Sequence, residues 1–422
     1  MSKSAPAGAV FARIIAVSVS FGYDTNVMAT ETVSNLDEFL TRGVEKIFPS
    51  EDFLRARLAE GKRLTLYLGI DATGPSLHLG HAITLRKLRR WQEMGHRAVL
   101  LVGDFTSMIG DPTDKTATRR RLTREEVLEN AKNYKQQASK ILSFDGENPA
   151  ELRFNSEWLS KLTLTEIVDL ASHFTVQQML ERDMFERRMQ EAKPIYLHEF
   201  LYPLMQGYDS VALDTDGEIG GNDQTFNMLA GRDLMKDLKG MEKFVIGMEL
   251  LTDPTGKKMG KSEGNMITLG DAPEDMYGKV MSWPDGMIVS GFEILTDVPR
   301  DELRTISRGL SSETLNPRDA KDRLAREIVA FFHGREAADA AAESFVKTFR
   351  QHETPDEMPE VAASTVLDAL VGAALCASRG DARRQIEQGG VKVNGTVVKD
   401  IEAAAKPGDV IQKGKRFFVR VI

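Results

Sequence analysis

A strand, a glycine-containing loop and a helix follow one another directly within residues 64–93, and this succession constrains the fold more than any other feature. Its first five residues, Leu-Thr-Leu-Tyr-Leu, are typical of a buried strand, and Leu85, Leu88 and Trp91 recur at helical spacing. A second apolar run, Arg97–Gly103, predicts the next strand. A strand, a helix and a strand over about 40 residues form one right-handed βαβ unit by strong precedent. The chain is therefore predicted to be an α/β protein with a parallel sheet.

The loop of this unit carries His78, Gly80 and His81 into the first turn of the helix. Backbone N–H groups and the helix dipole favour an anion there, and a glycine lets a flat ligand approach the backbone. Two histidines three residues apart share a helical face and can both donate to phosphate oxygens. Plain α/β architecture or half of a metal site would explain the same residues, although no further His or Cys cluster accompanies them.

Composition limits the remaining classes of protein. With 422 residues, 41% of them hydrophobic and 28% charged, the chain is long enough for two or three globular domains. The single cysteine, Cys376, excludes a disulfide within the chain and fits a reducing compartment, so a cytoplasmic protein is expected. The sequence has no 18-residue apolar run, so no membrane span is predicted. A net charge of −8 means that any surface for nucleic acid must be local.

Three further segments carry candidate ligand-binding groups. The polar loop 104–121 follows the carboxyl end of a strand, where open α/β sheets bind ligands, although a solvated basic loop is the alternative. Within Ile195–Val211, three polar side chains recur at spacings of four and three, which indicates either a pocket wall or a solvated helical face. The loop 252–265 follows an apolar strand, predicted over Phe244–Leu251, and its lysines suggest a pyrophosphate clamp or an exposed turn.

Shifts in composition predict the domain boundaries. Residues 1–33 read as a disordered extension, with Met28 as a hypothetical native start, and residues 34–60 read as two short helices. The predicted parts are an α/β domain over 34–270 with a helical insertion at about 123–192, a helical domain over 271–350, an acidic linker over 351–363, and a small α+β domain over 364–422. From Arg379 onward there are ten basic and five acidic residues, which is the local basic surface that an RNA-binding tail would need.

Several separated motifs resemble one family when they are taken together. His78-Leu-Gly-His81 and Lys258-Met-Gly-Lys-Ser262 resemble the two signature motifs of class I aminoacyl-tRNA synthetases. The pattern of polar residues around them is similar to that of tyrosyl-tRNA synthetases, namely Tyr67, Asp71, Thr73, Tyr202, Gln206, Asp209, Asp223 and Gln224. Residues 364–422 resemble an S4 RNA-binding domain, and the resemblance covers roughly residues 34–422. It implies a Rossmann-like catalytic domain, a helical tRNA-binding domain and the S4 domain.

The resemblance also implies a role for each matching residue. Groups for catalysis on ATP would be His78, His81, Thr73, Lys258, Lys261, Ser262, Lys115 and Arg119. Tyrosine would be bound by Tyr67, Asp71, Asp111, Tyr202, Gln206, Asp209 and Gln224. Further ATP contacts would come from Gly69, Gly80, Thr84, Gly221, Asp223 and Lys261, and RNA contacts from Arg379, Arg383, Arg384 and Lys392. The implied partners are tyrosine, ATP with its Mg²⁺, tRNA(Tyr) and a second copy of the chain docked through residues 123–192, and no protein-bound metal site is predicted.

Several positions depart from the family pattern, and Thr225-Phe226 departs from one branch of the family but fits another. Glu218 stands where many relatives have glutamine, Leu68 where some have a polar or thiol residue, and Gly260 in place of a serine. The alternatives are a tryptophanyl-tRNA synthetase, an inactive synthetase-like RNA-binding protein and a nucleotidylyltransferase. The last would lack both the tail and the amino-acid pocket.

Overall fold

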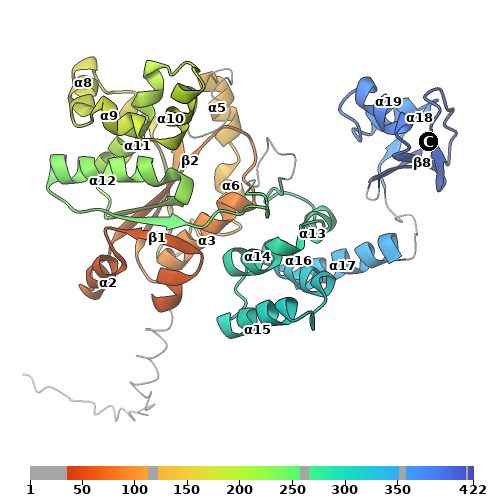
Figure 1. Ribbon diagram of the computed structural model, residues 1–422, viewed down its shortest axis with the longest axis horizontal. Helices are drawn as coiled ribbons and strands as arrows, with labels where there is room; N and C mark the ends of the chain where they lie inside the picture. The colour runs from red at the N-terminus through yellow and green to blue at the C-terminus, as the bar shows by residue number, and fades with distance from the viewer. Residues whose placement is uncertain (1–35, 113–121, 257–265, 351–357, 415–416) are drawn as a thin grey trace, which may run out of the picture. The chain divides into compact units, whose positions relative to one another are not determined.

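The computed structural model describes residues 36–112, 122–256, 266–350, 358–414 and 417–422 (Figure 1). The predicted extension 1–33 and five candidate site residues lie outside these ranges: Lys115, Arg119, Lys258, Lys261 and Ser262. Contacts divide the chain into Met1–Thr41, whose described part is a helix over residues 36–41, and Arg42–Ile422. Both sheets and the other helices belong to the second unit.

A six-stranded sheet forms the centre of the α/β region, in the order β1-β6-β5-β2-β3-β4. Its strands are β1 (Val44–Phe48), β2 (Thr65–Asp71), β3 (Arg97–Gly103), β4 (Glu151–Phe154), β5 (Gly217–Gly221) and β6 (Phe244–Met248). Strands β2 to β6 run parallel, and β1 pairs with β6 in the antiparallel sense. The order reverses between β2 and β5, so the carboxyl ends of these two neighbours mark where such a sheet binds ligands.

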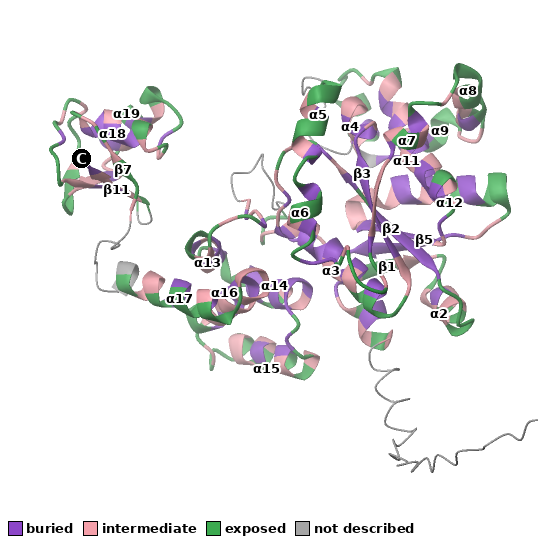
Figure 2. Cartoon of the chain, turned by 180° about the vertical axis from the view of Figure 1, so that it is seen from behind, coloured by how far each residue is buried: buried purple, intermediate pink, exposed green. Residues whose placement is uncertain are grey.

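Helices lie around the sheet (Figure 1). They are α2 (Glu51–Ala59), α3 (Leu79–Glu93), α4 (Thr106–Ile109), α5 (Arg124–Ala131), α6 (Tyr134–Ala138), α7 (Ser156–Leu159), α8 (Leu164–Ser172), α9 (Val176–Leu180), α10 (Asp183–Gln190), α11 (Leu197–Leu213) and α12 (Thr225–Lys239), with the 3₁₀ turn η1 (Asn222–Gln224) before α12. Helix α3 packs against β2 and β3, and α12 packs against β5 and β6. The central strands and the inner face of α3 are buried (Figure 2). The residues that gave the sequence its apolar periodicity therefore form the core, as the predicted α/β class requires.

Two short strands correct the sequence-based assignments. The segment predicted to close the first of two helices is β1, because Val44 and Ile47 find a pairing partner in β6 that local periodicity cannot reveal. The insertion predicted to be helical contains β4, whose Glu151 receives two hydrogen bonds of 2.7 Å from Arg97 on β3. The polar loop after β3 also contains a short helix, α4. Charged, four- or five-residue strands at a sheet edge leave little trace in the sequence.

Residues 273–350 are helical and contain α13 (Pro273–Met281), η3 (Asp285–Met287), α14 (Ile288–Leu295), α15 (Arg300–Ser311), α16 (Pro317–His333) and α17 (Arg335–Arg350). Proline opens α13 and α16, where a missing N–H costs nothing. Along α16, Leu324 and Ile328 are fully buried. The apolar stripe of α16 thus provides the contact with its neighbours, α13 and α17.

The C-terminal region folds around a separate core. It contains β7 (Glu360–Val361), α18 (Val366–Gly372), α19 (Arg379–Glu387), β8 (Val391–Val393), β9 (Thr396–Val398), β10 (Val410–Lys413) and β11 (Phe417–Val421), in the sheet order β7-β11-β10-β8-β9. The predicted Asn-Gly hairpin is confirmed, since Asn394 (φ 48°) and Gly395 (φ 82°) join β8 to β9. The sheet begins at β7, inside the range predicted as linker, because β7 pairs with β11.

Candidate active site

The candidate site lies where β2 and β5 end side by side. Tyr67 on β2 is the register partner of Glu218 on β5, and Asp71 and Gly221 close the two strands. Helix α11 supplies the three polar residues predicted to share a face, and it packs along α12. The topology therefore gathers the predicted tyrosine-binding groups at the switch point of the sheet.

Around Tyr67, buried polar groups form a connected set. The Tyr67 hydroxyl lies 2.9 Å from Ser210 Oγ, and Lys243 Nζ donates to the same oxygen over 2.7 Å. Lys243 also donates to Glu218, and both side chains are almost completely buried. Burial lowers the pKa of Lys243, and the Glu218 carboxylate opposes this shift. Burial also raises the pKa of Tyr67 well above its usual value, so its hydroxyl stays protonated at neutral pH.

Asp209, predicted together with Tyr67 to bind the substrate tyrosine, is held by two side chains. Trp158 Nε1 donates to one carboxylate oxygen over 2.7 Å, and Asn155 Nδ2 donates to the other over 3.2 Å. Burial raises the pKa of Asp209, although both donors favour its ionised form. The structure thus gives Asp209 a fixed position, and the Tyr67 hydroxyl is hydrogen-bonded to Ser210.

Asp71 is fixed in a similar way at the end of β2. Tyr202 donates to one of its oxygens over 3.0 Å, and Thr106 donates to the other over 2.7 Å. Asn155 Nδ2 in turn donates to Thr106 Oγ1 over 3.0 Å. A Cβ at Gly103 would lie 2.1 Å from the Asp71 carboxylate, so this close approach requires glycine. Burial raises the pKa of Tyr202, with the Asp71 charge as the next cause.

The next group of predicted tyrosine ligands lines the region between α11 and η1. Gln206 Nε2 donates to Glu218 over 3.0 Å, whereas Gln206 Oε1 is buried and has no hydrogen-bond partner among the residues that the structure describes. Gln224 Nε2 donates to Asp111 over 2.8 Å, and Arg182 lies 3.9 Å from the same carboxylate. A buried acceptor without a partner is costly, so Gln206 Oε1 marks a place for a ligand donor.

His78 and His81 cap the start of α3 through their own rings. Gly80 N–H donates to His78 Nδ1 and His78 N–H donates to His81 Nδ1, each over 3.1 Å. A ring nitrogen that accepts carries no proton, so each neutral ring carries its proton on Nε2. Burial lowers the pKa of His78 to about 4 and that of His81 well below its usual range. Both rings are therefore neutral at pH 7 and hold an Nε2–H donor.

The remaining predicted nucleotide contacts have varied surroundings. A Cβ at Gly80 would lie 2.9 Å from the His78 ring, and one at Gly221 would lie 2.5 Å from an Asp223 oxygen. Thr84 is buried and donates to the His81 carbonyl over 3.1 Å, so its hydroxyl serves the helix. Thr73 and Gly69 are exposed at the end of β2. A side chain at Gly80 or Gly221 would therefore require a neighbouring side chain to move.

The chain returns from the lysine-rich loop alongside the His78 segment. Leu79 N–H donates to the Ile267 carbonyl over 3.0 Å, and Leu269 N–H donates to the Leu77 carbonyl over 2.9 Å. Residues 257–265, which contain the predicted lysine clamp, precede this pairing directly in the sequence. The described end of the loop is therefore attached to the helix start that carries the two histidines.

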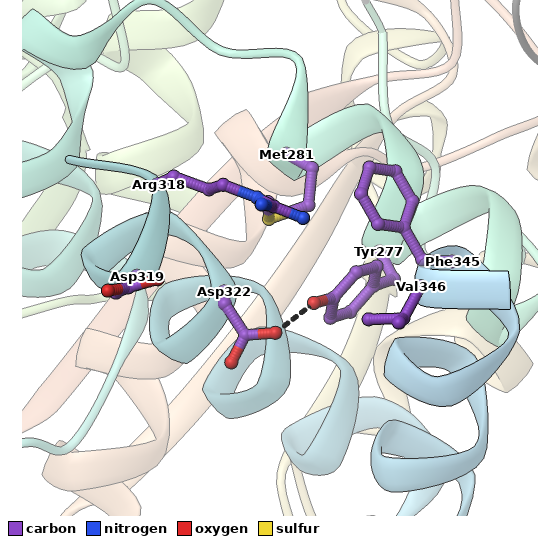
Figure 3. Close-up of a pocket in the computed structure, with 7 residues that line it drawn as sticks. All are labelled: Tyr277, Met281, Arg318, Asp319, Asp322, Phe345 and Val346. Carbon is purple, nitrogen blue, oxygen red and sulfur yellow. Dashed lines mark hydrogen bonds between the residues drawn. The ribbon is translucent and has the colours of Figure 1, made fainter. Parts of the chain in front are cut away.

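A separate cavity of about 180 Å³ lies among α13, α16 and α17 (Figure 3). Tyr277 donates there to Asp322, and the other lining residues are Met281, Arg318, Asp319, Phe345 and Val346. None of the predicted site residues lines this cavity.

The structure adds residues that the sequence reasoning missed. Ser210 follows Asp209 directly, and Lys243 opens an otherwise apolar strand segment, but neither position suggested a pocket. Trp158, Asn155, Thr106 and Arg182 were likewise not predicted to be site residues. The available signal was a lysine directly before an apolar strand. If such a lysine is buried, it needs a buried acid as its partner.

In the C-terminal region, Arg379, Arg383 and Arg384 are exposed on α19, and Lys392 on β8 is half-buried. Arg379 pairs with Asp368.

Within the described ranges, no three His, Cys, Asp or Glu side chains gather as a metal site would require, and no helix is long and apolar enough to cross a membrane.

Comparison with known proteins gives a consistent result. The family described as tRNA synthetases class I (W and Y) matches residues 59–350, and the S4 domain matches residues 367–411. A tyrosine–tRNA ligase of Moorella thermoacetica is 48% identical over 394 residues, which cover 90% of this chain and 94% of the relative. One of Thermotoga maritima is 46% identical over 390 residues, with 91% and 96% covered.

Solved structures share the fold. The C-terminally truncated mitochondrial tyrosyl-tRNA synthetase of Aspergillus nidulans gives a TM-score of 0.64 at 23% identity, over 77% of this chain and 97% of that one. The C-terminally truncated mitochondrial tyrosyl-tRNA synthetase of Coccidioides posadasii gives a TM-score of 0.60 at 25% identity, over 75% of this chain and 94% of that one. The two family models and the sequence relatives assign the chain to the tyrosine–tRNA ligase family of class I aminoacyl-tRNA synthetases, with an S4 domain near its C-terminus.

Proposed function

We propose that this chain activates tyrosine with ATP and then transfers the tyrosyl group to tRNA(Tyr). The observation that carries the proposal is the set of buried hydrogen-bonding groups around Tyr67 and Asp209, next to a helix start with two neutral histidines. In the first step, the tyrosine carboxylate attacks the α-phosphate of ATP and pyrophosphate leaves. In the second, a terminal ribose hydroxyl of the tRNA attacks the tyrosyl carbonyl and AMP leaves.

The chemistry of the first step fits these residues. The nucleophile is already an anion, so no general base is needed, and catalysis consists of positioning and of stabilising charge on the phosphates. The Nε2–H groups of His78 and His81 can donate to ATP at the N-terminus of α3, with Thr73 nearby in sequence. Further ATP contacts are proposed for Gly69, Gly80, Thr84, Gly221 and Asp223. Lys258, Lys261, Ser262, Lys115 and Arg119 are proposed to bind the pyrophosphate portion, and Mg²⁺ enters with ATP.

The amino-acid end supports a choice of tyrosine. A phenol oxygen between the Tyr67 hydroxyl and Asp209 would both accept and donate a hydrogen bond. Phenylalanine would leave these buried groups unpaired, and rejection of phenylalanine by tyrosyl-tRNA synthetases is itself the standard example of this effect. Gln206 Oε1 offers an acceptor for the substrate ammonium, and Asp71, Asp111, Tyr202 and Gln224 are proposed to complete that end.

Two partners are proposed in addition. Arg379, Arg383, Arg384 and Lys392 are proposed to contact the tRNA, since phosphate contacts come mainly from such side chains. A second copy of the chain is proposed to cover the apolar side chains that α8 to α11 expose, of which Leu164 is 76% exposed and Leu197 is 84% exposed. Sedimentation that shows only monomers would contradict the dimer. A cytoplasmic location is proposed from the composition.

Tyrosine-dependent exchange between ATP and labelled pyrophosphate tests the activity directly. Exchange with tyrosine is expected, and exchange with tryptophan instead would overturn the proposed substrate. Replacing Arg379, Arg383, Arg384 and Lys392 together by glutamine should leave exchange unchanged and impair tRNA charging. Equal loss of both activities would refute the RNA-binding role.

A further inference from the structure

Two opposite charges are buried beside the amino-acid end of the site. Lys243 is 0% exposed and Glu218 is 1% exposed. Removing an ammonium and a carboxylate from water is costly, and a well-packed apolar pair is often as stable. Stability alone therefore does not explain this pair, whereas its contacts with Gln206 and Ser210 connect it to both ends of the tyrosine pocket.

The first connection fixes the amide of Gln206. One oxygen of Glu218 accepts from Lys243, and the other accepts from Gln206 Nε2 over 3.0 Å. An ionised carboxylate can only accept, so the amide must turn its nitrogen towards Glu218 and its oxygen away. That oxygen is the buried acceptor which lacks a partner in the described part of the chain. A glutamine at position 218 could offer either an oxygen or an N–H, and the amide orientation would then be unfixed.

The second connection fixes the hydroxyl of Tyr67. An ammonium can only donate, so Ser210 Oγ must accept from Lys243 over their 2.7 Å contact. The Ser210 proton is then directed to another acceptor, and the Tyr67 oxygen lies 2.9 Å away. In the arrangement where Ser210 donates to Tyr67, the Tyr67 O–H can donate to the nearby Glu218 carboxylate or, when tyrosine is bound, to the substrate phenol.

We propose that Glu218 and Lys243 act as one positioning pair for tyrosine selection. Through Ser210, Lys243 makes Tyr67 a donor to the substrate phenol, and Glu218 turns the Gln206 oxygen towards the substrate ammonium. This inference rests on the proposed function, because it assumes that the pocket binds tyrosine. Neither residue touches the reacting atoms, so both are positioning residues.

Ser210→Ala is the first test, because it keeps the buried ion pair and removes only the link to Tyr67. Pyrophosphate exchange with tyrosine and with phenylalanine gives the two kcat/KM values. Their ratio should fall about tenfold, the effect of one hydrogen bond, with the KM for ATP unchanged. Lys243→Met should lower the ratio by a similar factor and also lower the melting temperature, since it leaves Glu218 unpaired. Glu218→Gln should raise the KM for tyrosine about tenfold.

Lys87→Met is the matched control. Lys87 is another buried lysine of the same domain, and its Nζ donates to the Arg42 carbonyl over 2.8 Å, away from the pocket. This variant should lose thermal stability and keep the tyrosine-to-phenylalanine ratio; a fall in that ratio as large as in Lys243→Met would overturn the proposal. So would a Ser210→Ala ratio within about twofold of the parent, or a rise in the KM for ATP equal to that for tyrosine. A parent protein without tyrosine-dependent exchange would instead refute the proposed function.

Discussion

At the proposed amino-acid end of the site, buried polar side chains hold one another, whereas at the proposed nucleotide end two neutral histidines form hydrogen bonds only with the backbone. Asp209 has two side-chain donors and Glu218 has a buried lysine, so the groups there are fixed before a ligand arrives. His78 and His81 use one ring nitrogen each for the helix start. The difference indicates that selection of the amino acid relies on preorganised partners, and that the charge for ATP must come from elsewhere in the chain.

The strongest way to separate the two ends is His78→Ala. It removes a phosphate donor whose interaction grows in the transition state, so kcat for adenylate formation should fall about 10²- to 10³-fold. The KM for tyrosine should stay near the parent value. Steady-state pyrophosphate exchange measures both kcat and this KM. His78→Asn is the control, because its side-chain oxygen can still cap Gly80 N–H. Equal increases in the KM values for tyrosine and for ATP would contradict the distinction between the two ends of the site.

Asp209→Ala should produce the converse result. The substrate phenol loses an acceptor that carries charge, so the tyrosine-to-phenylalanine ratio of kcat/KM should fall about 10- to 100-fold. The KM for ATP should not change. An unaltered ratio would exclude Asp209 from the choice of amino acid, whatever its effect on stability.

Trp158→Phe sharpens the claim that the acid is preorganised. The ring is kept, but Asp209 loses the 2.7 Å hydrogen bond from Nε1. Tyrosine affinity should fall about tenfold, measured by equilibrium binding of labelled tyrosine. Trp283→Phe is the control, because Trp283 is also a buried tryptophan but is not one of the site residues. Unchanged affinity would mean that Asn155 alone positions the carboxylate.

The smallest expected effect concerns acid. The pKa of His78 is about 4 in the folded chain and about 6.5 in the unfolded one, so the unfolded state binds the proton first. Stability from the two neutral rings is thus complete above about pH 6.5 and is lost as the pH falls towards 4. Thermal unfolding at pH 7 and pH 5 should show a loss of about 1 kcal/mol after discounting for partial exposure. The double variant His78→Asn/His81→Asn should lack that component; an identical loss would assign it to other groups.

Much of the fold was predictable because its core strands and long helices have strong apolar periodicity. Residues 64–103 yielded β2, α3 and β3, and the spacing of Tyr202, Gln206 and Asp209 placed all three on α11. The edge strands β1 and β4 were not predictable, because their pairing depends on strands far along the sequence.

The partners within the site were less accessible to sequence reasoning. Lys243 and Ser210 are 33 positions apart and meet only in the fold, where β6, which Lys243 directly precedes, pairs with β5. A lysine before an apolar strand usually reaches solvent, and the sequence does not say which one will be buried. The unusual Glu218 was visible, but only its ion pair with Lys243 explains why an acid can be accommodated there.

Gly80 has a consequence for how such proteins are recognised. A Cβ at this position would lie 2.9 Å from the His78 ring that caps the helix, so glycine between the two histidines serves the helix start as well as any ligand. A descendant that had lost its enzymatic activity could keep the signature intact. The motif therefore has a structural role at the start of α3 that does not depend on its proposed contact with ATP.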